Sequence, residues 1–351
     1  MDSKSENSVS DSGFSSWKKE HSKAKTAVSA IITLAVLAAL IYLVFHDSYE
    51  EILDNIIKVG VWGLLSILLM GFLYQMMEAA ALRALIQSKI PDFSLREAAE
   101  VVFLGVFGMT ATFSMGSIPM QSYYLYRRGM VPGDSMGILV IRQVLRKVSL
   151  MICTTVIFLL AGGPIFRANR DLFWVIMAGY SICAVLVTGM VLICTWTRIQ
   201  KLAQWFIDRL PEKGKWLKIK KSCTDNLNAL YTGSKLLLHQ KKYVGKSLLF
   251  NCIRMFIMYS IPFLCLFLLG DSSLSLVQTQ VLTAMTSLMT SVLPSAAGMG
   301  PAEVSFMVIF SRYIGPAMVS SALILYRFST YFAPFLLSVA VVHHAEKRLH
   351  Q

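Results

Sequence analysis

The sequence has 351 residues, of which 55% are hydrophobic and 15% are charged, and its formal net charge is +13. This composition is typical of a polytopic membrane protein, and the positive charge suits basic loops that face an anionic inner leaflet. Nucleic acid is a poor explanation of the charge, because the basic residues flank apolar segments and no nucleic-acid-binding motif is present.

The N-terminal residues 1–25 are polar and rich in Ser and Lys, which predicts a disordered cytoplasmic segment. The run that follows, AVSAIITLAVLAALIYLVF, is about 19 residues long and predicts an uncleaved membrane anchor near 26–46. Further apolar segments follow in chain order. They lie near 59–86, 98–115, 136–161, 172–196, 247–269, 276–293 with 302–314, and 317–342.

One long polar loop, residues 197–246, interrupts this pattern with twelve Lys or Arg residues and three acidic residues. It includes amphipathic pieces such as IQKLAQWFIDRL, which suit a membrane surface. The basic loop is expected on the cytoplasmic side of the membrane, and the acidic HDSYEEILDN segment after the first apolar run is expected on the outer side. We therefore expect one transmembrane domain over 26–345 and a cytoplasmic tail over 346–351.

The charge pattern also predicts a re-entrant segment. If residues 98–128 crossed the membrane once, the basic loop would lie outside, so we expect them to enter from inside and return. A helix over 98–112 would rise about 22 Å, short of a hydrocarbon core of about 30 Å. A matching hairpin, beginning with 276–293, is expected to enter from outside. The predicted fold is thus an all-α polytopic protein with about six full transmembrane helices and two oppositely oriented re-entrant hairpins.

Gly and Pro residues break both predicted hairpins. They are Gly116 and Pro119 in TATFSMGSIP, and Pro294, Gly298, Gly300 and Pro301 in LPSAAGMGPAE. Irregular backbone at membrane depth is tolerated only inside protein or around water, so each break is expected to line a polar cavity. A new helix is expected to begin near Pro119 and near Pro301, and its free N–H groups would suit a phosphate. Simple kinking of the helices is the alternative.

A weak internal symmetry relates the two halves. Gly116 is followed 26 residues later by Arg142, and Gly300 is followed 27 residues later by Arg327. Interrupted segments in corresponding positions of two halves indicate the central site of an inverted-repeat transporter. The alternative is chance, because Gly and Pro are common in membrane helices.

Six polar residues in the apolar segments are candidates for binding a lipid head group. They are Glu78, Gln121, Arg142, Arg146, Glu303 and Arg327. A buried charge costs at least about 2.5 kcal/mol on insertion scales, so these side chains should face a cavity or a partner. Guanidinium groups suit a phosphate, whereas Glu303 suits a cationic group or an arginine that moves during transport. Structural ion pairing and, for Glu303, simple compensation of the helix dipole are the alternatives.

Other polar residues indicate no further chemistry. Arg83 and Arg254 are expected to extend towards the head groups at the membrane surface. The six cysteines and six histidines have no metal-site or redox-pair spacing, so no metal or cofactor is expected. The sequence motifs of P-loop ATPases, serine hydrolases and zinc proteases are missing.

The second break resembles a known family. The segment Ala297-Gly298-Met299-Gly300-Pro301-Ala302-Glu303, with Pro294 upstream, is similar to the Gly-Gly-x-Gly-x-x-Glu break in the membrane region of lysylphosphatidylglycerol synthases, the multiple peptide resistance factors. Ala297 stands where the family has its first Gly, which would stiffen the turn. The first break, followed by RRG and an arginine-bearing span, also resembles this family, and the resemblance extends over roughly residues 25 to 345.

The resemblance implies that the protein translocates or binds a phospholipid or aminoacyl-phospholipid in the cytoplasmic membrane, by alternating access at the two breaks. In full-length members a soluble domain transfers lysine from lysyl-tRNA to phosphatidylglycerol, which supports resistance to cationic peptides. This chain is expected to lack that domain. Lysyltransferase activity with a partner synthase, and small-solute transport, remain alternatives. The expected partners are the membrane and its anionic or aminoacylated lipids. A second copy of the chain or a separate synthase is a further expected partner. Both termini are expected in the cytoplasm.

Overall fold

The computed structural model describes residues 49–112, 116–168, 170–195, 240–293 and 300–349, with a few more between 204 and 224. The predicted anchor, most of the basic loop, and Pro294 and Gly298 lie outside these residues. The helices are α3 (Tyr49–Ile86), α4 (Leu95–Ala111), α5 (Ser117–Arg127), α6 (Pro132–Ala168), α7 (Arg170–Thr195), α10 (Lys241–Leu268), α11 (Leu276–Val292), α12 (Pro301–Phe310), α13 (Pro316–Arg327), the π-helix η2 (Phe328–Phe332) and α14 (Ala333–Leu349).

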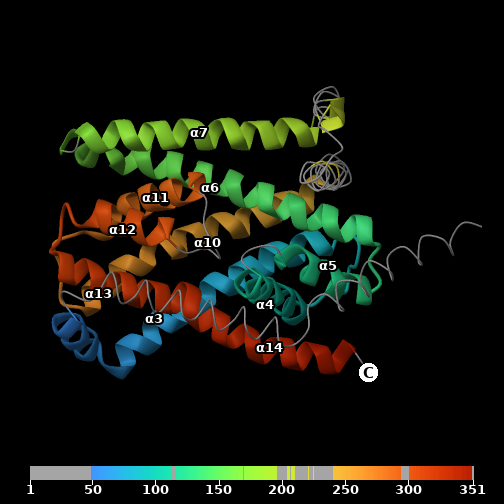
Figure 1. Cartoon of the computed structure of the whole chain (residues 1–351), viewed down its shortest axis with the longest axis horizontal. Coiled ribbons are helices and arrows are strands. Elements are labelled where there is room, and N and C mark those ends of the chain that lie inside the picture. Colours follow the sequence, from blue (N-terminus) through green and yellow to red (C-terminus); the bar gives the residue numbers. More distant parts are fainter. Residues whose placement is uncertain are drawn as a thin grey trace, which may run out of the picture.

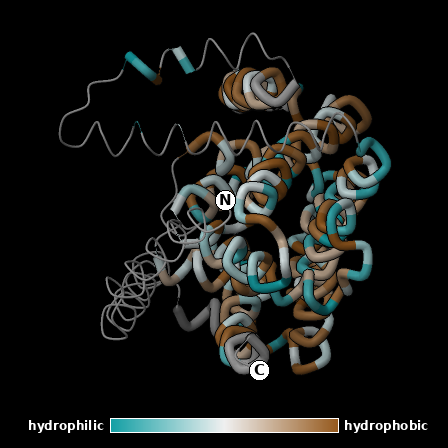
Figure 2. Tube along the Cα trace, turned by 90° about the vertical axis from the view of Figure 1, so that its right-hand side faces the viewer, coloured by the Kyte–Doolittle hydropathy of each residue, from teal (hydrophilic) through white to brown (hydrophobic). Residues whose placement is uncertain are grey.

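Five helical stretches are long and apolar enough to cross a membrane. They are Asp54–Ile86, Pro132–Arg167, Phe173–Leu192, Lys241–Leu268 and Pro316–His343. They match five of the six predicted spans, and the sixth prediction lies outside the described residues. Hydrophobic segments recur along the helices at the rim of the molecule as well as along those further in, in the end-on view of Figure 2. The all-α polytopic fold is confirmed.

Two pairs of shorter helices form the hairpins, which fill opposite halves of the molecule in Figure 1. At 17 residues each, α4 and α11 rise only about 26 Å. Both begin with a reciprocal capping box, formed by Ser94 with Glu97 and by Ser275 with Gln278. An ion pair between Arg128 and Glu97 joins the end of α5 to the start of α4. The first hairpin therefore enters and leaves at the same end of the molecule.

The second helix of each hairpin starts at its break. Pro301 is the first residue of α12, as predicted, and Gly300 before it has a φ of 94°, a left-handed conformation that favours glycine. In the first hairpin the new helix is expected near Pro119, and α5 begins two residues before it, at Ser117. Its earlier start follows from Gly116, whose N–H donates to the Thr112 hydroxyl and whose backbone is already helical.

Exchanging the two halves leaves the pattern of helix contacts unchanged. α3 packs on α4 as α10 packs on α11, and α5 packs on α6 as α12 packs on α13. Between the halves, α6 contacts α11 and α10, just as α14 contacts α4 and α13 contacts α3, while α3 and α10 contact each other. The start of α10 lies beside the end of α3, where Gln240 donates to the carbonyl of Ser88, so these two helices are antiparallel. This is the arrangement of an inverted repeat.

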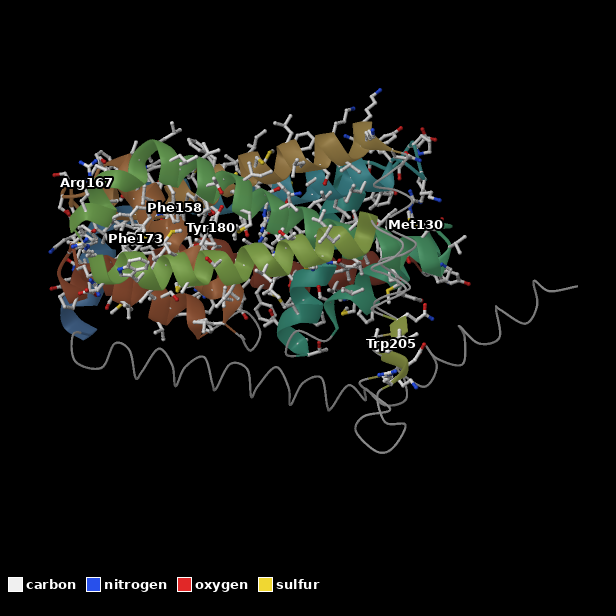
Figure 3. All side chains as sticks on the ribbon, turned by 90° about the horizontal axis from the view of Figure 1, so that it is seen from above. Met130, Phe158, Arg167, Phe173, Tyr180 and Trp205 are labelled. Carbon is white, nitrogen blue, oxygen red and sulfur yellow. The ribbon has the colours of Figure 1, made fainter. Side chains whose placement is uncertain are left out.

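The remaining long helix, α7, lies along the upper edge of the molecule in Figure 1 and runs across the face seen in Figure 3. It is fastened to α6 by edge-to-face contacts that run from Phe158 through Phe166 to Phe173, with ring centroids 5.1 and 5.3 Å apart. The hydroxyls of Thr155 and Tyr180 add a hydrogen bond of 2.7 Å. This helix lies outside the repeat.

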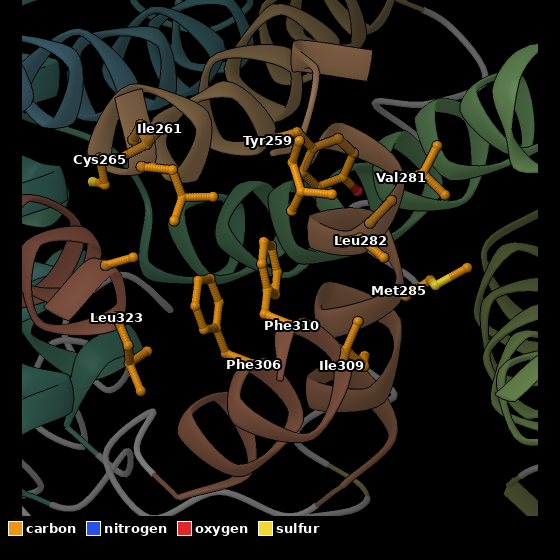
Figure 4. Packing of buried hydrophobic residues seen from close by; sticks show 14 of the residues in the cluster. Tyr259, Ile261, Cys265, Val281, Leu282, Met285, Phe306, Ile309, Phe310 and Leu323 are labelled. Atoms are coloured by element: carbon orange, nitrogen blue, oxygen red, sulfur yellow. The ribbon is translucent and has the colours of Figure 1, made fainter. Parts of the chain in front are cut away.

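Two apolar cores support the two halves. One involves the far part of α6, α10, α11, α12 and α13, and it contains the stacked rings of Phe306 and Phe310, with centroids 4.1 Å apart (Figure 4). The other involves the end of α3, α4, α5 and the start of α6. Along α10 the cores meet between Leu248 and Met255. The charged residues described next lie at this junction.

Candidate functional site

A single carboxylate on α3 meets three arginines at the junction of the cores. Glu78 Oε1 pairs with Arg142 Nη2, its Oε2 lies 3.2 Å from Arg254 Nη2, and Arg146 Nη1 lies 3.5 Å from Oε1. Glu78, Arg142 and Arg254 are all buried, whereas the Arg146 side chain is 33% exposed. We call Glu78 and these three arginines the Glu78 cluster.

Helical spacing explains why these residues meet. Arg142 and Arg146 are four residues apart and so share one face of α6. Tyr74 lies one turn before Glu78 on α3; its ring centroid is 4.4 Å from the guanidinium carbon of Arg254, and its hydroxyl accepts a hydrogen bond from that group. The crossing of α3 and α10 thus brings Arg254 to Glu78 although they are far apart in the chain.

The prediction that Arg254 extends to the membrane surface is wrong. Its side chain is 1% exposed and is held between Tyr74 and Glu78. A signal in the sequence pointed to this, because Ser247, Asn251 and Arg254 recur at helical spacing in an apolar segment and are all buried on α10. Arg83 behaves differently, since it donates to the backbone carbonyl of Phe93 at 2.9 Å beside the chain turn after α3.

The first hairpin contributes Gln121 to the Glu78 cluster. Its Oε1 accepts a hydrogen bond of 3.0 Å from Arg142 Nη1. Gln121 sits on α5, two residues after Pro119, and it packs against Gly105 on α4, where a Cβ atom would collide with its amide. The absence of a side chain at Gly105 therefore lets Gln121 reach Arg142.

The Glu78 cluster is not electrically balanced. Three guanidinium groups face one carboxylate, and no second carboxylate among the described residues pairs with them. Arg142 Nε, Arg254 Nε and Arg254 Nη1 are buried and have no hydrogen-bond acceptor in that part of the chain. Insertion scales put the cost of each arginine at membrane depth at about 2.5–3.5 kcal/mol, so an excess of cations calls for an anionic partner.

The second hairpin carries a balanced ion pair. Glu303 Oε1 lies 2.6 Å from Arg327 Nη2, and Glu303 Oε2 accepts the Gly300 N–H at 2.7 Å. Glu303 therefore caps α12 and also pairs with the arginine of the next span, which are the two structural alternatives expected for this residue. Both side chains are only partly buried.

Arg327 lies next to the first hairpin. It is followed by η2, which places the ring of Tyr331 5.8 Å from its guanidinium carbon. Tyr331 packs against Met109 and hydrogen-bonds the side chain of Thr110, both in the last turn of α4 before the first break. The two hairpins thus approach each other around Arg327.

The two halves use corresponding residues. Gln121 follows Pro119 by two residues and bonds Arg142, while Glu303 follows Pro301 by two residues and bonds Arg327. Sequence reasoning related the glycines to the arginines but missed these pairings. The short sequence match, Pro-Met-Gln to Pro-Ala-Glu, was the available signal.

Backbone N–H groups at the two breaks already have hydrogen-bond acceptors within the protein. The N–H groups of Gly116 and Gly300 already donate to Thr112 and Glu303, so the arginines offer more free donors to a ligand than these two backbone groups do. Lys147 donates to the carbonyl of Ser291 at 3.2 Å, which ties α6 to the last turn of α11 before the second break. No group of His, Cys, Asp and Glu suited to a metal ion occurs in the described ranges.

Comparison with known proteins places the whole arrangement in one family. No curated protein matches the chain. The family model described as the lysylphosphatidylglycerol synthase TM region matches residues 30–338, which include all of the residues described above for the two hairpins and their ion pairs. The chain therefore belongs to the family of the lysylphosphatidylglycerol synthase TM region.

Proposed function

We propose that the protein moves a phospholipid head group across the cytoplasmic membrane. Its family and its five apolar spans support a membrane protein that handles lipid. The match concerns the membrane region of that family, so the proposal concerns movement of a lipid and not its synthesis.

The observation that carries the proposal is the Glu78 cluster. A membrane protein that buries more guanidinium groups than carboxylates is stabilised when an anion binds beside them, because the anion offsets the excess positive charge. The phosphate of a lipid head group is the anion most available in a bilayer. Forked guanidinium donors match the oxygens of a phosphate in shape and charge. Arg146, whose side chain is 33% exposed, is the member that an entering head group would contact first.

Alternating access follows from the inverted repeat. In transporters of this kind, two pseudosymmetric halves rock around a site near the middle of the membrane. The two hairpins meet near Arg327, and its ion pair with Glu303 joins α12 to α13. We propose that this pair opens when a head group passes, so that Arg327 takes the phosphate while Glu303 keeps the cap of α12 or receives a cationic moiety.

The test is lipid movement in proteoliposomes. Fluorescent phosphatidylglycerol in the inner leaflet is followed by its accessibility to dithionite, with wild-type protein beside Glu303→Gln. The amide can still accept the Gly300 N–H, but it loses the charge that holds Arg327. We expect lipid movement to slow by about tenfold or more, which corresponds to about 1.4 kcal/mol in the barrier.

Glu97→Gln is the matched control. Glu97 also caps the first turn of a hairpin helix and also pairs with an arginine, but it does so at the end of the molecule. Its variant should move lipid at the wild-type rate. Equal rates for the wild type and Glu303→Gln, with both proteins folded, would contradict the proposed role of the pair.

A further inference from the structure

The excess charge of the Glu78 cluster carries information about its ligand. Three guanidinium groups against one carboxylate leave two positive charges to be balanced. The pair of Glu303 and Arg327 is neutral by comparison. The two corresponding sites of the repeat are thus electrically different. One unit of the difference arises because Gln121 occupies the position that Glu303 occupies in the second half, and the rest arises because Arg146, Arg254 and Glu78 belong to the first site only.

The free hydrogen-bond donors lie on the same residues. Arg254 Nε and Nη1 and Arg142 Nε are buried without an acceptor among the described residues, although both arginines are almost inaccessible to solvent. A buried donor without an acceptor is costly and uncommon in a folded protein. A ligand with several strong acceptors would satisfy these groups together.

Common lipid head groups differ in the negative charge that they would bring to the Glu78 cluster. A phosphodiester such as phosphatidylglycerol carries one negative charge, whereas a terminal phosphate monoester carries about −1.5 to −2 at pH 7 and three acceptor oxygens. Lysyl-phosphatidylglycerol adds two ammonium groups to its single phosphate charge, and these would be repelled by the arginines.

We infer that the Glu78 cluster selects lipids whose head group ends in a phosphate monoester or diphosphate, and that it disfavours aminoacylated head groups. The inference rests on the proposed function and specifies the substrate class of the same site. Arg142 and Arg254 supply the buried donors, Arg146 supplies the entry, and Gln121 keeps the site cationic by remaining uncharged.

The test compares the affinity of the purified full-length chain for four probes. They are dioctanoyl phosphatidic acid, dioctanoyl phosphatidylglycerol, lysyl-phosphatidylglycerol and inorganic pyrophosphate. Phosphatidic acid should bind about tenfold or more tightly than phosphatidylglycerol, and lysyl-phosphatidylglycerol should bind weakest. The preference should shrink as the pH falls from 7.5 to 5.5, because the monoester loses its second charge near pH 6.

Gln121→Glu is the decisive variant. It is close to isosteric, it keeps the acceptor for Arg142, and it adds one of the two missing negative charges inside the protein. We expect it to raise the thermal stability of the ligand-free protein and to abolish the preference for phosphatidic acid. Arg312→Gln, which removes an exposed arginine on the chain turn after α12, is the control and should keep the preference.

Several results would overturn the inference. They include equal affinities for phosphatidic acid and phosphatidylglycerol, tight binding of lysyl-phosphatidylglycerol, and a preference that survives in Gln121→Glu. Pyrophosphate that displaces phosphatidic acid at equal concentrations would assign the site to a free anion and overturn the head-group assignment.

The transport assay separates this inference from the proposed function. Lipid movement without selectivity would leave the function standing and reject the inference. Selective binding of phosphatidic acid without movement of any lipid would support the inferred selectivity and reject the proposed transport, since the site would then serve binding alone.

Discussion

At the scale of single residues, Glu78 determines how the charges in the middle of the molecule are arranged. The sequence predicted that Glu78, Arg142 and Arg146 would need partners, because a charge inside an apolar segment is costly. It did not predict which partners they take. The pairing of Glu78 with Arg254 depends on how α3 crosses α10, and a long-range crossing leaves no mark in local hydropathy.

Removing the charge of Glu78 should destabilise the protein strongly. Glu78→Gln would leave three arginines close together without a carboxylate, and breaking a buried pair in this way typically costs about 3–5 kcal/mol. The expected result is a marked loss of stability in detergent, measured by thermal or denaturant unfolding.

A double-mutant cycle tests the cause of that loss. Combining Glu78→Gln with Arg142→Gln removes one of the stranded charges, so the double variant should be more stable than the sum of the two single changes predicts. Glu97→Gln, which breaks a pair at the end of the molecule, should cost about 0–1 kcal/mol. Simple additivity in the cycle would show that Glu78 and Arg142 act independently.

At the scale of helices, hydropathy predicted where the spans and hairpins lie but not their internal hydrogen-bond register. The first residue of α5 differs from the prediction because Gly116 is bonded to Thr112. The π-helix after Arg327 was not predicted either, since a wider turn changes no residue type. Both features are set by contacts with other helices.

Gly71 shows how closely η2 packs against α3. A Cβ atom on Gly71 would lie 2.8 Å from the carbonyl carbon of Ser329 and closer still to its oxygen. Because the obstacle is backbone, Gly71→Ala must push η2 away, together with Tyr331 and Arg327. Overpacking of this kind costs about 1–3 kcal/mol, so we expect a lower unfolding temperature and slower lipid movement.

Gly189→Ala is the matched control for this prediction. Gly189 lies inside α7, and a Cβ atom there would meet nothing within 4 Å. Alanine should be neutral at that position or stabilise the helix by about 0.5–1 kcal/mol. If the two variants had the same stability, close packing of α3 on η2 would not be the reason for glycine at position 71.

At the scale of the whole molecule, the sequence predicted two related halves from two breaks and two arginines. The contact pattern bears out the relation, since each helix pair in one half has its equivalent in the other. The charges do not obey this symmetry. Uncharged Gln121 corresponds to charged Glu303, and Glu78 pairs with Arg142 but has no counterpart beside Arg327 among the described residues. The repeat therefore places two similar sites in the molecule, and single residues make them different.

Charge also predicts how the molecule lies in the membrane. One end carries most of the cations at the described helix ends and connections, namely Lys89, Arg96, Arg127, Arg128, Lys241 and Lys242. The ion pair of Lys89 with Asp134, together with that of Arg128 with Glu97, places the end of α3, both ends of the first hairpin and the start of α6 together there. The positive-inside rule puts this end in the cytoplasm.

Single cysteines on exposed connections would test this orientation in cysteine-free protein. Asp92→Cys lies before α4 at the basic end, and Ser272→Cys lies between α10 and α11 at the other. In intact cells a membrane-impermeant maleimide should label only the cysteine at 272, and in inverted vesicles only the one at 92. The reverse pattern would turn the molecule over in the membrane. Labelling of both positions from one side would be incompatible with α10 as a full span.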